Sequence, residues 1–309
     1  QVVNPMFAFP KDVLMRYLPI ETLGESQGAI TQKATDQDTG ETVILKSIAL
    51  AQATHWKQLE LFRREARVLS QLEHGHIPRL LNYIEALQDA QPSCHLVLQY
   101  LPGEALSKRV YARGSLSPEQ VFQVASQVLQ VLSYLHAFNP PCIHRDIKPS
   151  NLLFTPEGRV SVIDFGGTQK SLAEGETLVG TYGYMAPEQY AGKANITSDL
   201  YGLGASLIFL LSAYEPANLA QKEMCLQFRS VVDCSAAMAD WLEQLVQPDP
   251  QQRFHRAEDA LAVLTALFPE WRPLPLEAPM ALQSPAQLPT FALTTQENTR
   301  QAVQSKETA

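Results

Sequence analysis

Two short polar motifs, separated by a fixed distance, constrain this chain more than any other feature. The first is His-Arg-Asp-Ile-Lys-Pro-Ser-Asn at residues 144–151, and the second is Asp-Phe-Gly at residues 164–166. Together they supply carboxylate, ammonium and amide groups, and carboxylate and amide oxygens are the hard ligands that Mg²⁺ prefers. Either motif alone is typical of a solvated loop. Both together, in this order, indicate a fold that gathers these groups at one site.

The local patterns change from strand-type to helix-type along the chain. Residues 17–46 show short β-type runs, with a hairpin turn predicted at Asp36-Gln37-Asp38-Thr39-Gly40. Residues 55–72 have helical periodicity instead. The apolar stripe of that helix consists of Leu59, Phe62, Ala66 and Leu69. Residues 96–100 are typical of a buried strand, which ends at Pro102-Gly103.

Beyond this breaker the pattern is mainly helical. Ser117 followed by Pro118 predicts a helix start, because Ser is a favoured N-cap and Pro a favoured first helical residue. Helical patterns resume near Thr197 and continue to about Phe268. From Pro269 onward, Pro, Gln, Thr and Ala occur without periodicity. We expect this last part to be a disordered tail or a linker.

With these elements in order, the two motifs resemble those of the eukaryotic-type (Hanks-type) serine/threonine protein kinases, in a bacterial form. The resemblance covers residues 17–268 and implies an α+β, bilobal protein-kinase-like fold. A small antiparallel β-sheet with one helix would form the N-lobe, and a larger, mainly helical C-lobe would follow. The implied divisions are an N-terminal arm at 1–16, an N-lobe at 17–101, a C-lobe at 102–268 and a Pro-rich tail at 269–309.

The resemblance implies transfer of the γ-phosphoryl group of ATP to Ser or Thr hydroxyls of protein substrates. Asp146 would accept the proton of the attacking hydroxyl, and Lys148 would neutralise charge on the moving phosphoryl group. Asn151 and Asp164 would bind Mg²⁺, with Mn²⁺ as an alternative metal. Catalysis of this kind depends mostly on positioning and electrostatics.

The nucleotide site is implied by a second set of matches. Lys46 ends a Val-Ile-Leu-Lys strand that resembles the Val-Ala-Ile-Lys strand of the family, and Glu65 matches the helical Glu that holds this lysine. Leu98 lies at the gatekeeper position. The other positions implied to contact the nucleotide are Ile44, the backbone groups of Gln99 and Leu101, and the apolar floor residue Leu153.

The glycine-rich loop departs from the family pattern. Its residues are Leu23, Gly24, Glu25, Ser26, Gln27, Gly28 and Ala29. Ser26 and Ala29 replace two of the glycines that let backbone close over phosphates without a Cβ clash, so we expect a less mobile lid. Thr31 replaces the apolar residue that covers the adenine in the family, which predicts reduced ATP affinity.

The segment from the second motif to Glu188 resembles an activation segment that ends in Ala-Pro-Glu. Thr168, Ser171 and Thr177 are candidate sites of self-phosphorylation. A phosphate there would have the Arg145 guanidinium to pair with. By the same resemblance, the Thr181 hydroxyl bonds the catalytic Asp and Lys.

Two further matches imply structural roles. Asp199 resembles the helix-start Asp that braces the backbone of the catalytic loop. Arg253 resembles the Arg that pairs with the Glu of Ala-Pro-Glu, here Glu188. Removing one partner of such a buried pair is destabilising, so we expect Arg253→Ala to weaken the helical lobe.

Two alternative functions remain open from the sequence. A pseudokinase or scaffold with weak nucleotide binding would explain the altered glycine loop, but the polar catalytic positions are all present. A small-molecule kinase of the aminoglycoside or choline type would not require the activation segment or Lys148. We therefore favour an ATP-dependent protein serine/threonine kinase.

Composition limits the partners. The net charge of −8 argues against nucleic-acid binding, because no basic stripe is present to displace counterions from phosphates. The four cysteines form no Cys-x-x-Cys pair, which suits a reducing, cytoplasmic setting. No apolar run is long enough to cross a bilayer, so we expect no membrane segment within this chain. A membrane anchor in a longer parent protein stays compatible with a sequence that begins with Gln.

Overall fold

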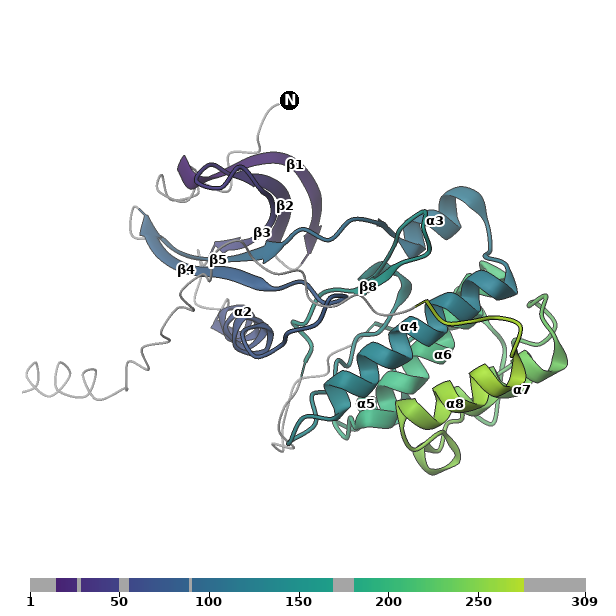
Figure 1. The fold of residues 1–309 in the computed structure, drawn as a ribbon. Coiled ribbons are helices and arrows are strands. Elements are labelled where there is room, and N and C mark those ends of the chain that lie inside the picture. Colours follow the sequence, from purple (N-terminus) through teal and green to yellow (C-terminus); the bar gives the residue numbers. More distant parts are fainter. Residues whose placement is uncertain (1–14, 27–28, 50–55, 89–90, 169–180, 275–309) are drawn as a thin grey trace, which may run out of the picture.

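Five antiparallel strands form the amino-terminal lobe, and helices form most of the second lobe (Figure 1). The computed structural model describes residues 15–26, 29–49, 56–88, 91–168 and 181–274. The predicted α+β, bilobal arrangement is therefore confirmed.

The strands of the first lobe lie in the order β1-β2-β3-β5-β4. Their bounds are Tyr17–Ser26 (β1), Ala29–Asp36 (β2), Thr42–Ala49 (β3), Leu80–Gln88 (β4) and Gln91–Gln99 (β5). The predicted hairpin turn joins β2 to β3, where the Gly40 amide donates to the Asp36 carbonyl at 2.7 Å. Gly40 has a φ of 73°, a conformation that glycine adopts without strain. The turn chemistry of the sequence thus accounts for this connection.

The sheet register places the nucleotide-site candidates on one face. Thr31 of β2 lies opposite Lys46 of β3, and Ile44 of β3 lies opposite Leu98 of β5. Because side chains alternate along a strand, Ile44 and Lys46 point to the same side of the sheet, together with their partners. The helix α2 (Trp56–Leu69) packs through its apolar residues into the core that includes Ile48 of β3.

A short three-stranded sheet joins the two lobes. It consists of β6 (Glu104–Ala105), β7 (Leu152–Phe154) and β8 (Val160–Val162), in the order β6-β7-β8. The two predicted motifs flank this sheet, since the first runs directly into β7 and the second begins shortly after β8. Both motifs are therefore brought to the junction of the lobes.

In the second lobe, α6 contacts the helices α3, α4 and α7. The bounds of the helices in this lobe are Leu106–Arg113 (α3), Pro118–His136 (α4), Pro187–Tyr190 (α5), Ile196–Ser212 (α6), Ala236–Leu245 (α7) and Ala257–Leu267 (α8). Nearly all residues of α6 are buried. At Gly204 a Cβ atom would lie 2.7 Å from Cβ of Leu245, so glycine permits α6 and α7 to approach closely. A two-stranded hairpin, β9 (Gln221–Lys222) with β10 (Cys225–Leu226), lies between α6 and α7 in the sequence.

The predicted start of α4 is confirmed. The Ser117 hydroxyl accepts a hydrogen bond from the Gln120 amide at 3.3 Å, and the Gln120 side chain accepts one from the Ser117 amide at 3.2 Å. This reciprocal pair is a capping box, with Pro118 at the first helical position.

The expectation of a structureless tail from residue 269 is wrong for its first part. Trp271 stacks on Phe268 with ring centroids 4.8 Å apart and contacts Phe122 of α4 at 5.6 Å. The backbone is attached to α4 as far as Leu274, because the Leu274 amide donates a hydrogen bond to the side-chain oxygen of Gln123 at 3.2 Å. The aromatic residues outweigh the prolines here, because they bury apolar area on α4. Residues 275–309 and 1–14 lie outside the described part of the chain.

Within the described ranges, no helix combines the length and the apolar character that crossing a membrane requires. All four cysteines are free thiols.

Candidate active site

The backbone of the catalytic loop is held by one buried carboxylate. Asp199, in the first turn of α6, accepts hydrogen bonds from the amides of His144 at 2.9 Å and Arg145 at 2.8 Å. Arg145 has a φ of 69°, which is unfavourable for a residue with a side chain. His136 of α4 hydrogen-bonds the same carboxylate at 2.9 Å. The predicted bracing role of Asp199 is confirmed, whereas no sequence pattern predicted the contact with His136.

Asp146 lies at the centre of a connected polar cluster. Its carboxylate accepts a hydrogen bond from the Thr181 hydroxyl at 3.0 Å, and Lys148 Nζ lies 2.7 Å from its other oxygen. Lys148 also donates to Thr181 Oγ1 at 2.6 Å. Asn151 Nδ2 donates to Asp146 Oδ2 at 3.0 Å. Thr181, Lys148 and Asn151 therefore hold the Asp146 carboxylate in one orientation.

Lys46 forms ion pairs with carboxylates from both lobes. Its Nζ lies 2.7 Å from Glu65 Oε2 on α2 and 2.9 Å from Asp164 Oδ1. Burial alone would lower the pKa of Lys46, but the two carboxylates together raise it above its ordinary value. The charge of Lys46 lowers the pKa of Asp164 to about 2. At neutral pH the site therefore presents a charged ammonium group beside an ionised carboxylate.

A divalent metal ion fits the donor set of this site. The Asp164 side chain is 44% exposed although it contacts Lys46, so a carboxylate oxygen can reach a ligand. Asn151 uses its NH₂ group for two bonds to Asp146, which leaves its carbonyl oxygen as the donor to a metal. No three His, Cys, Asp or Glu side chains in the described ranges gather into a metal site. The ion would take its other ligands from phosphates and water, as Mg²⁺ usually does.

The adenine-site candidates occupy consistent positions. The Gln99 amide donates to the Arg79 carbonyl at 2.9 Å, so this amide is already bonded where the chain passes between the lobes. Leu101 is buried, and Leu153 of β7 packs near Gly103, where a Cβ would lie 3.1 Å from the leucine Cβ. The segment that links the two lobes and the proposed floor residue Leu153 therefore lie beside the same turn, at Gly103.

The predicted glycine-rich lid and the predicted activation segment are described only in part. Leu23, Gly24, Glu25 and Ser26 belong to β1, and Ala29 and Thr31 belong to β2, but Gln27 and Gly28 lie outside the described residues. Ser171 and Thr177 also lie outside them. Thr168 is fully buried, so its hydroxyl is not accessible to a phosphate donor in this conformation, and its phosphorylation stays a prediction.

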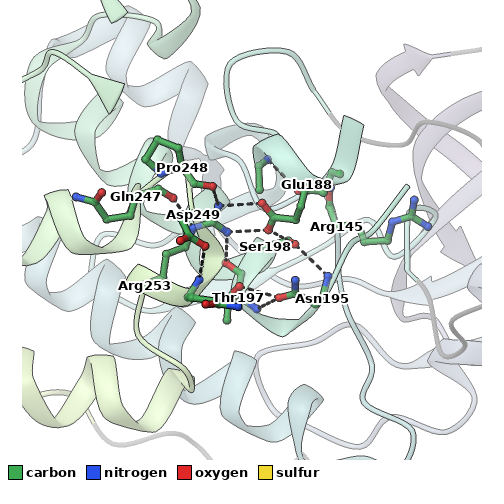
Figure 2. Close-up of polar contacts among 12 residues, drawn as sticks. Arg145, Glu188, Asn195, Thr197, Ser198, Gln247, Pro248, Asp249 and Arg253 are labelled. Atoms are coloured by element: carbon green, nitrogen blue, oxygen red, sulfur yellow. Dashed lines mark hydrogen bonds and ion pairs between the residues drawn. The ribbon is translucent and has the colours of Figure 1, made fainter. Parts of the chain in front are cut away.

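The predicted ion pair between Arg253 and Glu188 is confirmed and is the centre of a larger network (Figure 2). The guanidinium donates to both carboxylate oxygens, at 2.7 and 2.9 Å, and to the carbonyl groups of Gln247, Pro248 and Thr197. Ser198 of α6 donates to the same carboxylate at 2.6 Å. This network attaches the end of the activation segment to the helical lobe.

A second group of residues, not predicted from the sequence, holds the segment just after Thr181. Tyr184 donates to Glu215 Oε2 at 2.9 Å, and Tyr111 of α3 donates to the other oxygen. Gly183 has a φ of 91°, and a Cβ there would lie 2.9 Å from the Ala217 amide nitrogen. These contacts join residues that lie far apart in the sequence, and no sequence motif predicts them.

Comparison with known proteins agrees with this geometry. Residues 17–264 match the family model described as protein kinase domain. Serine/threonine-protein kinase F of Synechocystis sp. is 33% identical over 272 residues, which make up 81% of this chain and 54% of that protein. Serine/threonine-protein kinase C of the same organism is 31% identical over 276 residues, 82% of this chain and 50% of that protein.

Serine/threonine-protein kinase PrkC of Bacillus subtilis is 26% identical over 273 residues, 84% of this chain and 41% of that protein. The chain thus spans about half the length of the curated relatives it matches. The family model covers most of the chain, and the relatives are named serine/threonine-protein kinases. This chain therefore belongs to the protein kinase domain family, among the eukaryotic-type serine/threonine kinases found in bacteria.

Proposed function

We propose that this chain is an ATP- and Mg²⁺-dependent protein serine/threonine kinase, which transfers the γ-phosphoryl group of ATP to Ser or Thr hydroxyls of protein substrates. The observation that carries the proposal is two clusters of hydrogen-bonded and ion-paired side chains at the junction of the lobes. Asp146 is oriented by Lys148 and Thr181, and Lys46 is held between Glu65 and Asp164. Positioned groups of this kind are what phosphoryl transfer requires.

Asp146 would orient the substrate hydroxyl and accept its proton. Lys148, 2.7 Å from that carboxylate, would place positive charge beside the oxygens of the moving phosphoryl group. Asn151 and Asp164 would hold the metal, either Mg²⁺ or Mn²⁺, which neutralises charge on the phosphates when bound. Lys46 would bind the α- and β-phosphates, since its high pKa keeps it charged.

The remaining positions would bind the rest of the nucleotide. Thr31 and Ile44 share the sheet face that carries Lys46, and Leu98 and Leu153 would add apolar contacts to the adenine. The backbone of Gln99 and Leu101 would hydrogen-bond its edge. We also propose Leu23, Gly24, Glu25, Ser26, Gln27, Gly28 and Ala29 as the lid over the phosphates.

Incubation with labelled ATP, Mg²⁺ and a generic basic protein tests the proposal, with Asp146→Asn as control. We expect incorporation by the wild-type chain and a loss of at least about a hundredfold in the variant, because a positioned base contributes roughly 10²–10⁴ in rate. Equal incorporation by both proteins would disprove the enzyme assignment and favour a binding role.

We propose in addition that Ser171 or Thr177 is phosphorylated in the active enzyme. The support is Arg145, which brings a guanidinium to the catalytic loop and whose backbone amide donates to Asp199. Mass spectrometry of the active protein tests this, and a fully active protein with both hydroxyls unmodified would contradict it.

A further inference from the structure

The position of Glu65 depends on the rotation of α2 about its own axis. Glu65 is buried and reaches Lys46 at 2.7 Å. The apolar stripe of α2 attaches the helix to the sheet, but apolar burial is not directional and tolerates small rotations. A helix turns about 100° per residue, so a modest rotation would move a carboxylate away from its lysine. Directional contacts elsewhere on α2 can prevent this.

One directional contact lies on the opposite flank of α2. Arg63 Nε lies 2.7 Å from Glu85 Oε1 of β4, and Arg63 Nη2 lies 3.0 Å from Glu85 Oε2. Two parallel bonds of this kind fix the mutual orientation of the two groups as well as their distance. The Tyr83 hydroxyl donates to Glu85 Oε1 at 2.6 Å and thereby holds the carboxylate toward the helix.

Arg63 and Glu65 are two positions apart, so they project about 200° apart around the helix. Glu65 points to the catalytic lysine on β3, while Arg63 points to β4 at the far edge of the sheet. An ion pair on each side therefore fixes the orientation of α2. A rotation that released one pair would strain the other.

We propose that Arg63 and Glu85 are positioning residues of the kinase site, whose bidentate ion pair sets the rotation of α2 and so keeps Glu65 on Lys46. The inference rests on the proposed function for its catalytic consequence. Its structural part, the orientation of α2, is independent of catalysis.

The exposure of the pair distinguishes this role from a purely stabilising one. Both side chains are nearly half exposed, and ion pairs in such positions add little to the free energy of unfolding. Their geometry can still select one helix orientation. Exposed charges are screened by salt, so the effect on activity should weaken as ionic strength rises.

Charge-swap variants of the full chain test the inference. Arg63→Glu and Glu85→Arg each place like charges together, and the double variant Arg63→Glu/Glu85→Arg restores an opposite pair. Arg67→Glu is the matched control, since Arg67 is an exposed arginine one turn further along the same helix. Each protein is assayed for kcat and for KM of ATP, and amide hydrogen exchange is followed over residues 56–69.

We expect each single variant to lose about fivefold to tenfold in kcat/KM for ATP, the scale of roughly 1 kcal/mol of lost orientation. The double variant should recover to within about threefold, and Arg67→Glu should stay within about twofold of the wild type. Amide exchange over α2 should quicken in the single variants and slow again in the double variant.

Single variants with wild-type amide exchange over α2 would overturn the inference, whether or not the wild-type chain shows kinase activity. In an active enzyme, a double variant no better than either single one would overturn it too. A wild-type chain without phosphoryl transfer would count against the proposed function alone, because the exchange measurement still decides the orientation of α2.

Discussion

At the scale of single residues, Thr181 is the group whose effect on the chemistry is most sharply defined. Its hydroxyl bridges Lys148 at 2.6 Å and Asp146 at 3.0 Å. Thr181→Val keeps the shape of the side chain but removes the bridge, so we expect kcat to fall about tenfold to a hundredfold with little change in KM for ATP. Steady-state kinetics measure both quantities. Thr181→Ser keeps the hydroxyl and should retain most activity; an equally inactive Ser variant would show that the methyl group matters instead.

Arg253 is the residue on which the end of the activation segment depends most. Its guanidinium is fully buried and bonds Glu188 together with three backbone carbonyl groups. Arg253→Ala leaves the carbonyl groups without this donor and the buried Glu188 carboxylate without a positive charge beside it, so we expect the free energy of unfolding to fall by about 3–5 kcal/mol. Urea denaturation gives this value.

Arg253→Lys serves as the control for charge. A lysine ammonium cannot reproduce the planar set of five donors, so the Lys variant should recover only part of the loss. Full recovery would mean that the charge alone accounts for the stability, and that the geometry of the network in Figure 2 is unimportant.

At the scale of elements, the turn between Thr181 and α5 shows how a glycine fixes the course of the end of the activation segment. Gly183 combines a φ of 91° with a backbone nitrogen, that of Ala217, 2.9 Å from any added Cβ. Gly183→Ala must therefore displace the segment, and we expect kcat/KM for a protein substrate to fall about tenfold or more while KM for ATP changes little. Kinetics with each substrate varied in turn provide the measurement.

Gly192 is the matched control for this prediction. It also has a positive φ, of 69°, but no atom lies within 4 Å of an added Cβ. Gly192→Ala should show only the cost of backbone strain, roughly 1 kcal/mol in stability, and unchanged kinetics. Similar kinetic losses in both variants would mean that the contact with Ala217 is irrelevant.

Elements with local chemical signals could be predicted from the sequence, and elements held by distant contacts could not. The β2–β3 turn contains Gly40, and α4 begins with a Ser117 cap, so both follow from neighbouring residues. In contrast, the attachment of Tyr184 to Glu215 joins segments 31 residues apart. Trp271 likewise contacts α4 through stacking that composition alone does not indicate.

At the scale of the whole molecule, the candidate site was predictable because its residue types follow a known order along the chain. The ion pair between Lys46 and Glu65, 19 positions apart, follows from that resemblance. The pair between Lys46 and Asp164, 118 positions apart, was not predicted. The surroundings of the site were harder to predict, because charge and burial depend on packing. The burial of Thr168 and the pair between Arg63 and Glu85 are of this kind.

The stability of the whole chain should depend on pH through a histidine in the sheet. His95 of β5 is fully buried between two hydroxyl groups, Ser47 Oγ at 2.8 Å and Ser93 Oγ at 3.0 Å. Burial lowers the pKa of His95 to about 4. Between pH 6.5 and 4 the unfolded chain binds a proton at this residue that the folded chain does not, so acid favours unfolding in this range.

We therefore expect His95 to contribute a loss of roughly 2 kcal/mol in the free energy of unfolding between pH 7 and pH 5. Below about pH 4 both states bind the proton and the loss ends. Urea denaturation at half-unit pH steps measures the slope. His95→Gln keeps a polar side chain between the two serines and should flatten the slope, although it lowers stability overall. Parallel slopes for the wild type and His95→Gln would show that acid acts through other groups, such as His74, whose pKa burial also lowers to about 4.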